Sequence, residues 1–178
     1  KITRIGQYAL AYCSNLTSVD FSNANLLDSI GNFAFYQCTS LQSIEFPASL
    51  TSLDIYGSFC GCKKLSYVKF PTNTKISYIG NGAFESTNLT TFNVPATCVY
   101  LVGSTFSGTK IEYFTVEGGN KHFKEYNGSI FNYHLTALIS HRRSGELSLP
   151  LTTNAICDLA FSAFSGNIRL EKNITSIS

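Results

Sequence analysis

Residues 5–21 read Ile-Gly-Gln-Tyr-Ala-Leu-Ala-Tyr-Cys-Ser-Asn-Leu-Thr-Ser-Val-Asp-Phe, and residues 30–47 read Ile-Gly-Asn-Phe-Ala-Phe-Tyr-Gln-Cys-Thr-Ser-Leu-Gln-Ser-Ile-Glu-Phe-Pro. The two stretches align position by position without a gap. The same frame returns, with single-residue insertions or deletions, at residues 53–71, 79–95 and 101–116. A unit of about 22 to 26 residues cannot bury its own apolar side chains, so successive units must stack on one another. The sequence therefore predicts a solenoid.

The pattern is interrupted once and then resumes. An irregular stretch occupies residues 118–144, after which the apolar positions return at 156–161 and 168–170. We count about six units and expect a single solenoid over residues 1–178 that carries the 118–144 stretch as an insertion. Because the sequence opens within one unit and closes on what looks like the start of another, we expect it to be a fragment of a longer solenoid.

Each unit ends in a segment Leu-x-x-Val/Ile-x-Phe, in which apolar and polar residues alternate. This period of two is typical of a strand with one buried face. Because each strand has the same place and direction in its unit, stacking produces a parallel sheet. The first apolar residues of these segments would form a buried column, made of Leu16, Leu41, Leu65, Leu89 and Ile111.

The other half of each unit, Ile-Gly-x-x-Ala-Phe, contributes a second apolar column. Its members are Leu10, Phe35, Phe59, Phe84, Phe106 and Phe161. Each ring that becomes fully buried would contribute roughly 1.5 to 3 kcal/mol. The glycine of the motif suits either a positive φ or a close approach of two backbones, so we expect most coils to turn there.

The consensus Ile-Gly-x-x-Ala-Phe-x-x-Cys-x-x-Leu-x-x-Ile-x-Phe-Pro resembles the BspA-like, Treponema pallidum type of leucine-rich repeat over nearly the whole chain. The resemblance implies a mainly β leucine-rich-repeat solenoid, with a parallel sheet on its concave face and short strands and turns on its convex face. It also implies a secreted or cell-surface protein, from a bacterium or a trichomonad-like protist, that attaches to host cells, matrix or other microbes. Residues 120–131 are similar to a β-hairpin insertion of that family, and Asn127-Gly128 suits its two-residue turn.

Composition and motifs exclude several function classes. The net charge is +2, and no run of lysine and arginine suggests a nucleic-acid partner. No stretch of 18 or more apolar residues could span a membrane. No general acid and base pair, no nucleophile beside a histidine and no phosphate-binding loop stands at a recognisable spacing. We therefore expect neither an enzyme nor a cofactor.

Three of the six cysteines, Cys13, Cys38 and Cys62, share one position of the repeat, whereas the fourth and fifth units lack it. Small, polarisable cysteine packs well in a core, so buried free thiols are the main interpretation. Disulfides stay open if the protein is extracellular, since six cysteines allow 15 pairings. Cys60-Gly-Cys62 is spaced too closely for a usual zinc site, and we expect no metal.

The polar residues of the predicted strands would face outward in two columns. We predict that these columns bind a ligand, with the tyrosines as anchors because each offers a large contact area and a hydroxyl. The alternative is that they only cover the sheet. The first column is Ser18, Ser43, Tyr67, Thr91 and Tyr113, and the second is Asp20, Glu45, Lys69, Asn93 and Thr115.

The insertion is the most basic region of the chain and contains or adjoins all three histidines, His122, His134 and His141. Its basic side chains are a second candidate site, for anionic glycans, because arginine can bind sulfate or carboxylate in bidentate fashion. A solvated surface of mixed charge is the simpler interpretation. The candidate residues are Lys121, Lys124, Arg142 and Arg143.

Taken together, the repeat and its resemblance predict an adhesion or protein-interaction module that binds host or matrix macromolecules through its concave face. Two alternatives stay open: a lectin-like module that uses the basic insertion, and a structural spacer. The partner would be a protein or a glycan.

Overall fold

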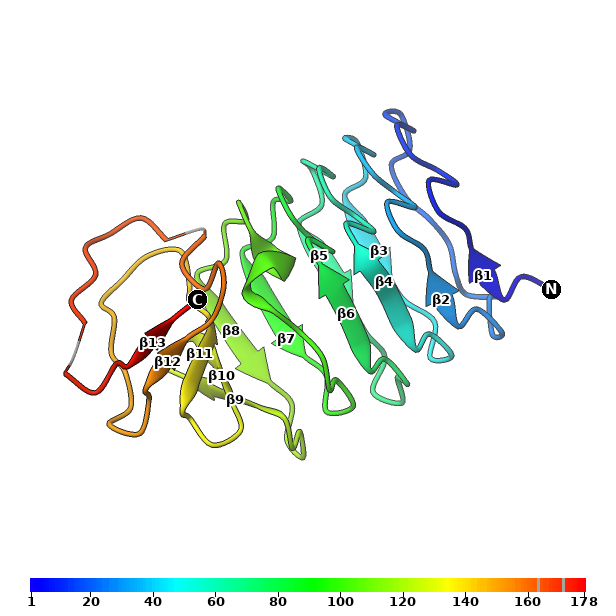
Figure 1. Cartoon of the computed structure of the whole chain (residues 1–178). Helices are drawn as coiled ribbons and strands as arrows, with labels where there is room; N and C mark the ends of the chain where they lie inside the picture. The colour runs from blue at the N-terminus through cyan, green and yellow to red at the C-terminus, as the bar shows by residue number, and fades with distance from the viewer. Residues whose placement is uncertain (163, 171) are drawn as a thin grey trace.

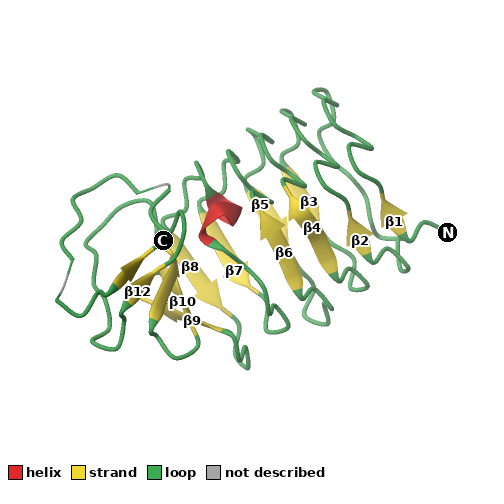
Figure 2. Cartoon of the chain, viewed as in Figure 1, coloured by secondary structure: helices red, strands yellow, loops and turns green. Residues whose placement is uncertain are grey.

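The computed structural model describes residues 1–162, 164–170 and 172–178. It is a mainly β solenoid of about seven turns with almost no helix, so the predicted fold class is confirmed. Figure 1 shows the coils stacked side by side from the N-terminal to the C-terminal end. The one helical segment assigned among the described residues is a single 3-10 turn, η1 (Gly103–Phe106), drawn in red in Figure 2.

The Leu-x-x-Ile-x-Phe segments form the expected parallel strands. β3 (Ser43–Glu45) pairs with β5 (Tyr67–Lys69), and β7 (Thr91–Val94) pairs with β8 (Tyr113–Val116). The ladder is not continuous from β5 to β7, so the structure has two strand pairs here where the sequence predicts one sheet. Single backbone bonds still join the neighbouring coils: the Asn88 amide donates to the Leu65 carbonyl oxygen at 2.9 Å.

A second parallel sheet runs along the opposite side of the coils, at the Ile-Gly position. Its order is β1-β2-β4-β6, which Figure 1 shows as a row of arrows in front of the other strands. The register places equivalent residues side by side, as in Ile5, Ile30, Leu53 and Ile79. The bounds are β1 Arg4–Ile5, β2 Ser29–Ile30, β4 Ser52–Tyr56 and β6 Tyr78–Asn81.

The two predicted apolar columns form part of the core, which also contains the isoleucine and leucine positions of the second sheet, such as Ile30 and Ile79. Four members of the leucine column are buried, whereas Leu16, in the first coil, is only partly covered. In the aromatic column Phe35, Phe59, Phe84 and Phe106 are at most 2% exposed. Their rings stack nearly parallel from coil to coil, with centroids 4.8 Å apart between Phe35 and Phe59. Such offset stacks add to the burial energy of each ring.

None of the glycines of the Ile-Gly motif has a positive φ, and most of them serve a close backbone approach. A Cβ at Gly80 would lie 2.0 Å from the Asp54 carbonyl oxygen, and a Cβ at Gly31 would lie 2.8 Å from the Gln7 amide nitrogen. At Gly6, in the first coil, no atom lies within 4 Å. The left-handed turn falls two residues later, on Tyr8 and its equivalents Phe33, Gly57 and Gly82.

The insertion contains the expected hairpin. β9 (Phe123–Tyr126) and β10 (Ser129–Asn132) are antiparallel, and the turn residues Asn127 and Gly128 have φ values of 48° and 74°. Positive φ at both positions is the geometry of a type I′ turn.

The hairpin is built into the wall of the solenoid and does not merely flank it. β10 pairs with β11 (Ala137–Ser140), which continues in parallel to β12 (Ala155–Ile156) and β13 (Ser176–Ile177). Ile130 and Phe131 of β10 are buried in two separate core clusters. The hairpin therefore lies where the main core ends and a smaller one begins.

Candidate functional site

The first candidate site is the strand face, which we define as the two outward columns predicted from the sequence. All ten of these side chains are exposed. The register confirms the stacking for the strand residues, with Ser43 opposite Tyr67 and Thr91 opposite Tyr113. Ser18 and Asp20 lie in the first coil, outside any strand, and join the face through the bond from the Gln42 amide to the Thr17 carbonyl oxygen.

Several side chains of the strand face are held by bonds between coils. The Lys69 ammonium lies 3.1 Å from a Glu45 carboxylate oxygen, and this contact raises the pKa of Lys69. Both groups are well exposed, so the pair contributes little stability. Farther along, the Thr115 hydroxyl donates to Asn93, and the Asn93 amide donates to the Glu117 carboxylate, at 2.9 and 3.0 Å. These bonds fix side-chain orientation before any ligand arrives.

The two predicted anchor tyrosines are accessible. Tyr67 is 49% exposed and Tyr113 is 52% exposed, with Thr91 on the coil between them. The amide of Phe114, next to Tyr113, donates to the Gly128 carbonyl oxygen at the hairpin turn. The hairpin turn therefore adjoins the strand face at its last coil.

A hollow of about 760 Å³ adjoins the other end of the strand face. Its lining combines apolar side chains, including Val19, Phe21 and Phe46, with the carboxylates of Asp20 and Glu45. The volume lies in the range of small-ligand sites, and an apolar floor with a few polar groups is typical of such sites.

The basic insertion does not form one patch. Lys121 and Lys124 line a hollow near Tyr133 at the open end of the hairpin, and the Lys124 ammonium lies 4.8 Å from the Tyr133 ring centre. Arg142 instead lies at the turn end, where its Cδ would be 3.2 Å from a Cβ added to Gly128. The exposed Arg143 follows it, and its amide donates to the Ile111 carbonyl oxygen. The four basic residues are thus divided between the two ends of the hairpin.

His141 is buried and belongs to no basic surface. It is 4% exposed, its Nδ1 lies 2.7 Å from the Ser129 hydroxyl, and its ring packs edge-on against Phe161 and Phe164. Its Nε2 has no hydrogen-bond partner among the described residues. Burial, together with the neighbouring Arg142 charge, lowers the pKa of His141 to about 4. A neutral histidine therefore joins β10 to the following coil.

The sequence reasoning missed an exposed aromatic edge at the turns beside the second sheet. The rings of Tyr8 and Phe33 are stacked 5.2 Å apart, and Phe33 is stacked with Tyr56 at 6.5 Å. Tyr12 and Tyr36 continue the edge with perpendicular contacts. These residues occupy variable positions of the repeat, so only comparison of one coil with the next could have identified them. Only Tyr8, Phe33 and Tyr56 stack face to face, and Tyr12 is 68% exposed.

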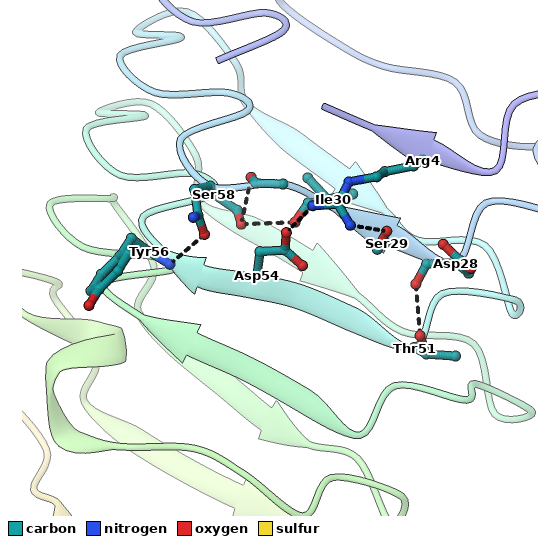
Figure 3. Close-up of polar contacts among 10 residues, drawn as sticks. Arg4, Asp28, Ser29, Ile30, Thr51, Asp54, Tyr56 and Ser58 are labelled. Atoms are coloured by element: carbon teal, nitrogen blue, oxygen red, sulfur yellow. Dashed lines mark hydrogen bonds and ion pairs between the residues drawn. The ribbon is translucent and has the colours of Figure 1, made fainter. Parts of the chain in front are cut away.

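Polar side chains also bridge the coils around the second sheet. Figure 3 shows Arg4 bonded to both Ser29 and Asp54. The Tyr56 amide donates to the Asn32 side-chain oxygen. The buried Ser58 hydroxyl donates to carbonyl oxygens of the preceding coil, at Ile30 and Gly31. The Gly31 carbonyl oxygen also accepts the Ala34 amide, so the Ser58 hydroxyl adds a contact between coils to a bond within the coil.

The cysteines of the repeat position have the same role inside the core. The Cys38 thiol donates to the Leu10 carbonyl oxygen and the Cys62 thiol to the Phe35 carbonyl oxygen, both at 3.1 Å. Burial raises the pKa of Cys62 to about 12. Cys13, in the first coil, is exposed. All six cysteines are free thiols in the structure.

Within the described ranges, no group of histidine, cysteine and acidic side chains is arranged to hold a metal ion. The described part of the chain also contains no helix that is both long and apolar enough to cross a membrane.

Solved structures share this fold. The pneumococcal vaccine antigen PcpA superposes with a TM-score of 0.84 at 23% identity, over 99% of this chain and 44% of PcpA. A leucine-rich cell-surface protein of Faecalibacterium prausnitzii superposes with a TM-score of 0.74 at 19% sequence identity, over 99% of this chain and 54% of that one. A leucine-rich repeat protein of Bacteroides ovatus superposes with a TM-score of 0.69 at 19% sequence identity, over 99% of this chain and 49% of that one. The chain thus spans about half the length of these proteins.

A search among curated proteins found no match to the sequence. A family model for the BspA type leucine rich repeat region does match, in six copies over residues 1–136. The motif, the stacked parallel strands and this match agree, and the chain belongs to the BspA-type leucine-rich repeat family.

Proposed function

We propose that this chain is part of a cell-surface adhesion module that binds a host or matrix macromolecule through the strand face, without catalysis. The observation that carries the proposal is the pair of half-exposed tyrosines, Tyr67 and Tyr113, on a surface whose polar side chains are already bonded to one another. A rigid surface loses little conformational entropy on binding. Tyrosines that are set among such polar groups are typical energetic centres of interfaces.

The relatives support a surface location in general terms. One solved structure with this fold is described as a leucine-rich cell-surface protein and another as a vaccine antigen. The leucine-rich repeat family is consistent with a protein-interaction module. The ligand and the location of this chain are our extension of that likeness.

The test is the binding of the purified chain to host cells and to a panel of matrix proteins and glycans. A Tyr67→Ala, Tyr113→Ala double variant removes the anchors, and a Tyr12→Ala, Tyr56→Ala variant removes two tyrosines of the aromatic edge that are at least as exposed. We expect the first variant to weaken binding about 30-fold or more, as loss of interface centres does, and the second to bind as the parent does. Circular dichroism of both variants checks that the coils remain folded.

The other outcomes assign the function differently. Loss of binding only in the Tyr12, Tyr56 variant would move the site to the aromatic edge. Competition by free sulfated sugar, abolished in a Lys121→Ala, Lys124→Ala variant, would favour a lectin-like module at the hairpin. Absence of binding by the parent chain to every member of the panel would favour a structural spacer.

A further inference from the structure

The sequence contains two Asn-Gly dipeptides, and the structure places them in different surroundings. Asn81 is the last residue of β6, and its carbonyl oxygen accepts the Gly57 amide of the neighbouring coil at 2.8 Å. The Asn81 Oδ1 is buried and has no hydrogen-bond partner among the described residues. Asn127 is instead exposed, and with Gly128 it forms the hairpin turn. The second dipeptide is therefore the one that is open to water and lies outside any strand.

The backbone amide of Gly128 is bonded to a carboxylate. It donates to the Oε1 of Glu125, an exposed residue of β9, at 2.6 Å. This bond follows the N–H direction in the plane of the peptide, so both faces of the nitrogen stay open. A Glu85 oxygen would lie 2.9 Å from a Cβ added to Gly82, but within the described ranges the Gly82 amide makes no bond to a carboxylate. The two dipeptides thus differ in whether a base is in contact with the amide proton.

This contact suits the cyclisation of asparagine to a succinimide. Covalent geometry keeps the Gly128 nitrogen within about 5 Å of the Asn127 side-chain carbonyl carbon in every rotamer. When the nitrogen attacks that carbon, a new C–N bond forms and the amide proton passes to Glu125. The resulting carboxylic acid gives the proton to the side-chain NH2 group, so the old C–N bond breaks and ammonia leaves. Water then opens the ring at either carbonyl and leaves aspartate or isoaspartate at position 127.

We propose that the hairpin turn modifies itself at Asn127, with Glu125 as the general base for attack by the Gly128 nitrogen. A positioned acid or base typically accelerates a proton transfer by about 10²- to 10⁴-fold. Glycine contributes as well, because it has no side chain to shield the attacking nitrogen.

The modification would alter the end of the strand face. Isoaspartate adds a methylene group to the backbone of a turn that has only two residues, and the register of a hairpin depends on the length of its turn. The Gly128 carbonyl oxygen accepts the Phe114 amide at 2.9 Å, next to Tyr113. A longer turn would disturb this bond, so the modified chain should differ from the parent in the surroundings of Tyr113.

The experiment incubates the whole folded chain and measures aspartate and isoaspartate at both dipeptides by peptide mass spectrometry, together with the release of ammonia. We expect Asn127 to react at least about ten-fold faster than Asn81. In urea the two dipeptides lose their different surroundings and should react at similar rates. This comparison separates the effect of the fold from the effect of the Asn-Gly sequence.

Variants of the chain identify the base. Glu125→Gln keeps an oxygen that can accept the Gly128 amide but cannot take its proton, so we expect the reaction at Asn127 to slow at least about ten-fold. Its rate should also rise more steeply with pH than that of the parent, because hydroxide must replace the carboxylate. Glu85→Gln removes the carboxylate beside the other dipeptide and should leave the rate at Asn127 unchanged. Circular dichroism checks that both variants are folded.

An unchanged rate at Asn127 in the Glu125→Gln variant would overturn the proposal. A faster rate in that variant would overturn it too, because the bond to Glu125 would then protect the amide. Equal rates at Asn81 and Asn127 in the folded parent would show that the hairpin turn has no special reactivity.

Discussion

The regular coils and the hairpin region reach the same end, a buried core with satisfied backbone groups, by different means. In the coils from Phe35 to Phe106, the aromatic column repeats one residue type, as in the stacked rings of Phe35 and Phe59. In the hairpin region, individual polar residues make the connections. Asn120 is buried, donates to the carbonyl oxygens of Pro95 and Cys98, and accepts the amides of His122 and Phe123.

This difference indicates how each region tolerates the substitution of a single residue. A column distributes its stability over many equivalent contacts, so one coil resembles its neighbours. A single buried polar residue such as Asn120 or His141 has no equivalent to replace it, and the loss of one partner leaves another group unsatisfied. We therefore expect the coils to respond to packing and the hairpin region to respond to polarity and pH.

The largest effect should come from the aromatic column. Phe59→Ala removes a fully buried ring stacked on both sides, and we expect it to lower the free energy of unfolding by about 3 to 5 kcal/mol. Urea denaturation would measure the loss. Ile55→Ala, at a residue 50% exposed in the same coil, is the control and should cost below about 1 kcal/mol. Similar losses for both would mean that the column does not dominate.

The next effect should appear in the hairpin region on acidification. The pKa of His141 is about 4 in the folded state against an ordinary value of 6.5, so the unfolded chain takes up the proton first as pH falls. The stability that the neutral ring provides is fully present above pH 6.5. It is lost as the pH falls from 6.5 to about 4, and the free energy of unfolding then drops by on the order of 3 kcal/mol.

Urea denaturation at several pH values would measure this dependence, and hydrogen exchange should show the loosening in β10 and β11 before the first coils. His141→Phe keeps a ring between Phe161 and Phe164 and should flatten the pH dependence, although the Ser129 bond is lost. An unchanged pH profile in this variant would assign the acid sensitivity to other groups.

The smallest of these effects is a difference in stability between alanine substitutions at two glycines of the same motif. Gly80→Ala places a methyl group 2.0 Å from the Asp54 carbonyl oxygen if nothing moves, so we expect a cost of about 1 to 3 kcal/mol. Gly6→Ala meets no atom within 4 Å and should be neutral or slightly stabilising. The two melting temperatures, measured against the parent, test this. Equal shifts would show that the glycine serves conformational freedom and not the contact between coils.

Much of the regular region follows from the repeat alone. Leu41 and Phe59 could be assigned to buried columns because the same residue type returns at the same place, and Ser43 could be aligned with Tyr67 for the same reason. The sequence left the reason for the glycines open, since positive φ and close approach both favour glycine. The structure puts the positive φ on residues such as Tyr8 and Phe33, which no propensity argument would select.

Of the hairpin region, the sequence predicted the hairpin itself but not how it is packed into the solenoid. Asn127-Gly128 indicates the hairpin, because the two residues specify the turn locally. The burial of His141 depends on Ser129 and Phe161, which the fold brings together from different coils. The hollow at Asp20 likewise requires side chains of three coils. The repeat aligned Asp20 with Glu45, but neither the burial of His141 nor the hollow itself leaves a periodic signal in the sequence, so neither was expected.

The thiols that bond between coils give the solenoid a set of internal chemical reporters. Cysteine reacts with alkylating reagents and oxidants as the thiolate, and burial keeps the pKa of Cys62 at about 12. Cys62 can therefore be modified only while its coil is open, whereas the exposed Cys13 is accessible in the closed state. The modification rates of Cys38 and Cys62, compared with that of Cys13, would record how often each of these coils separates from its neighbour.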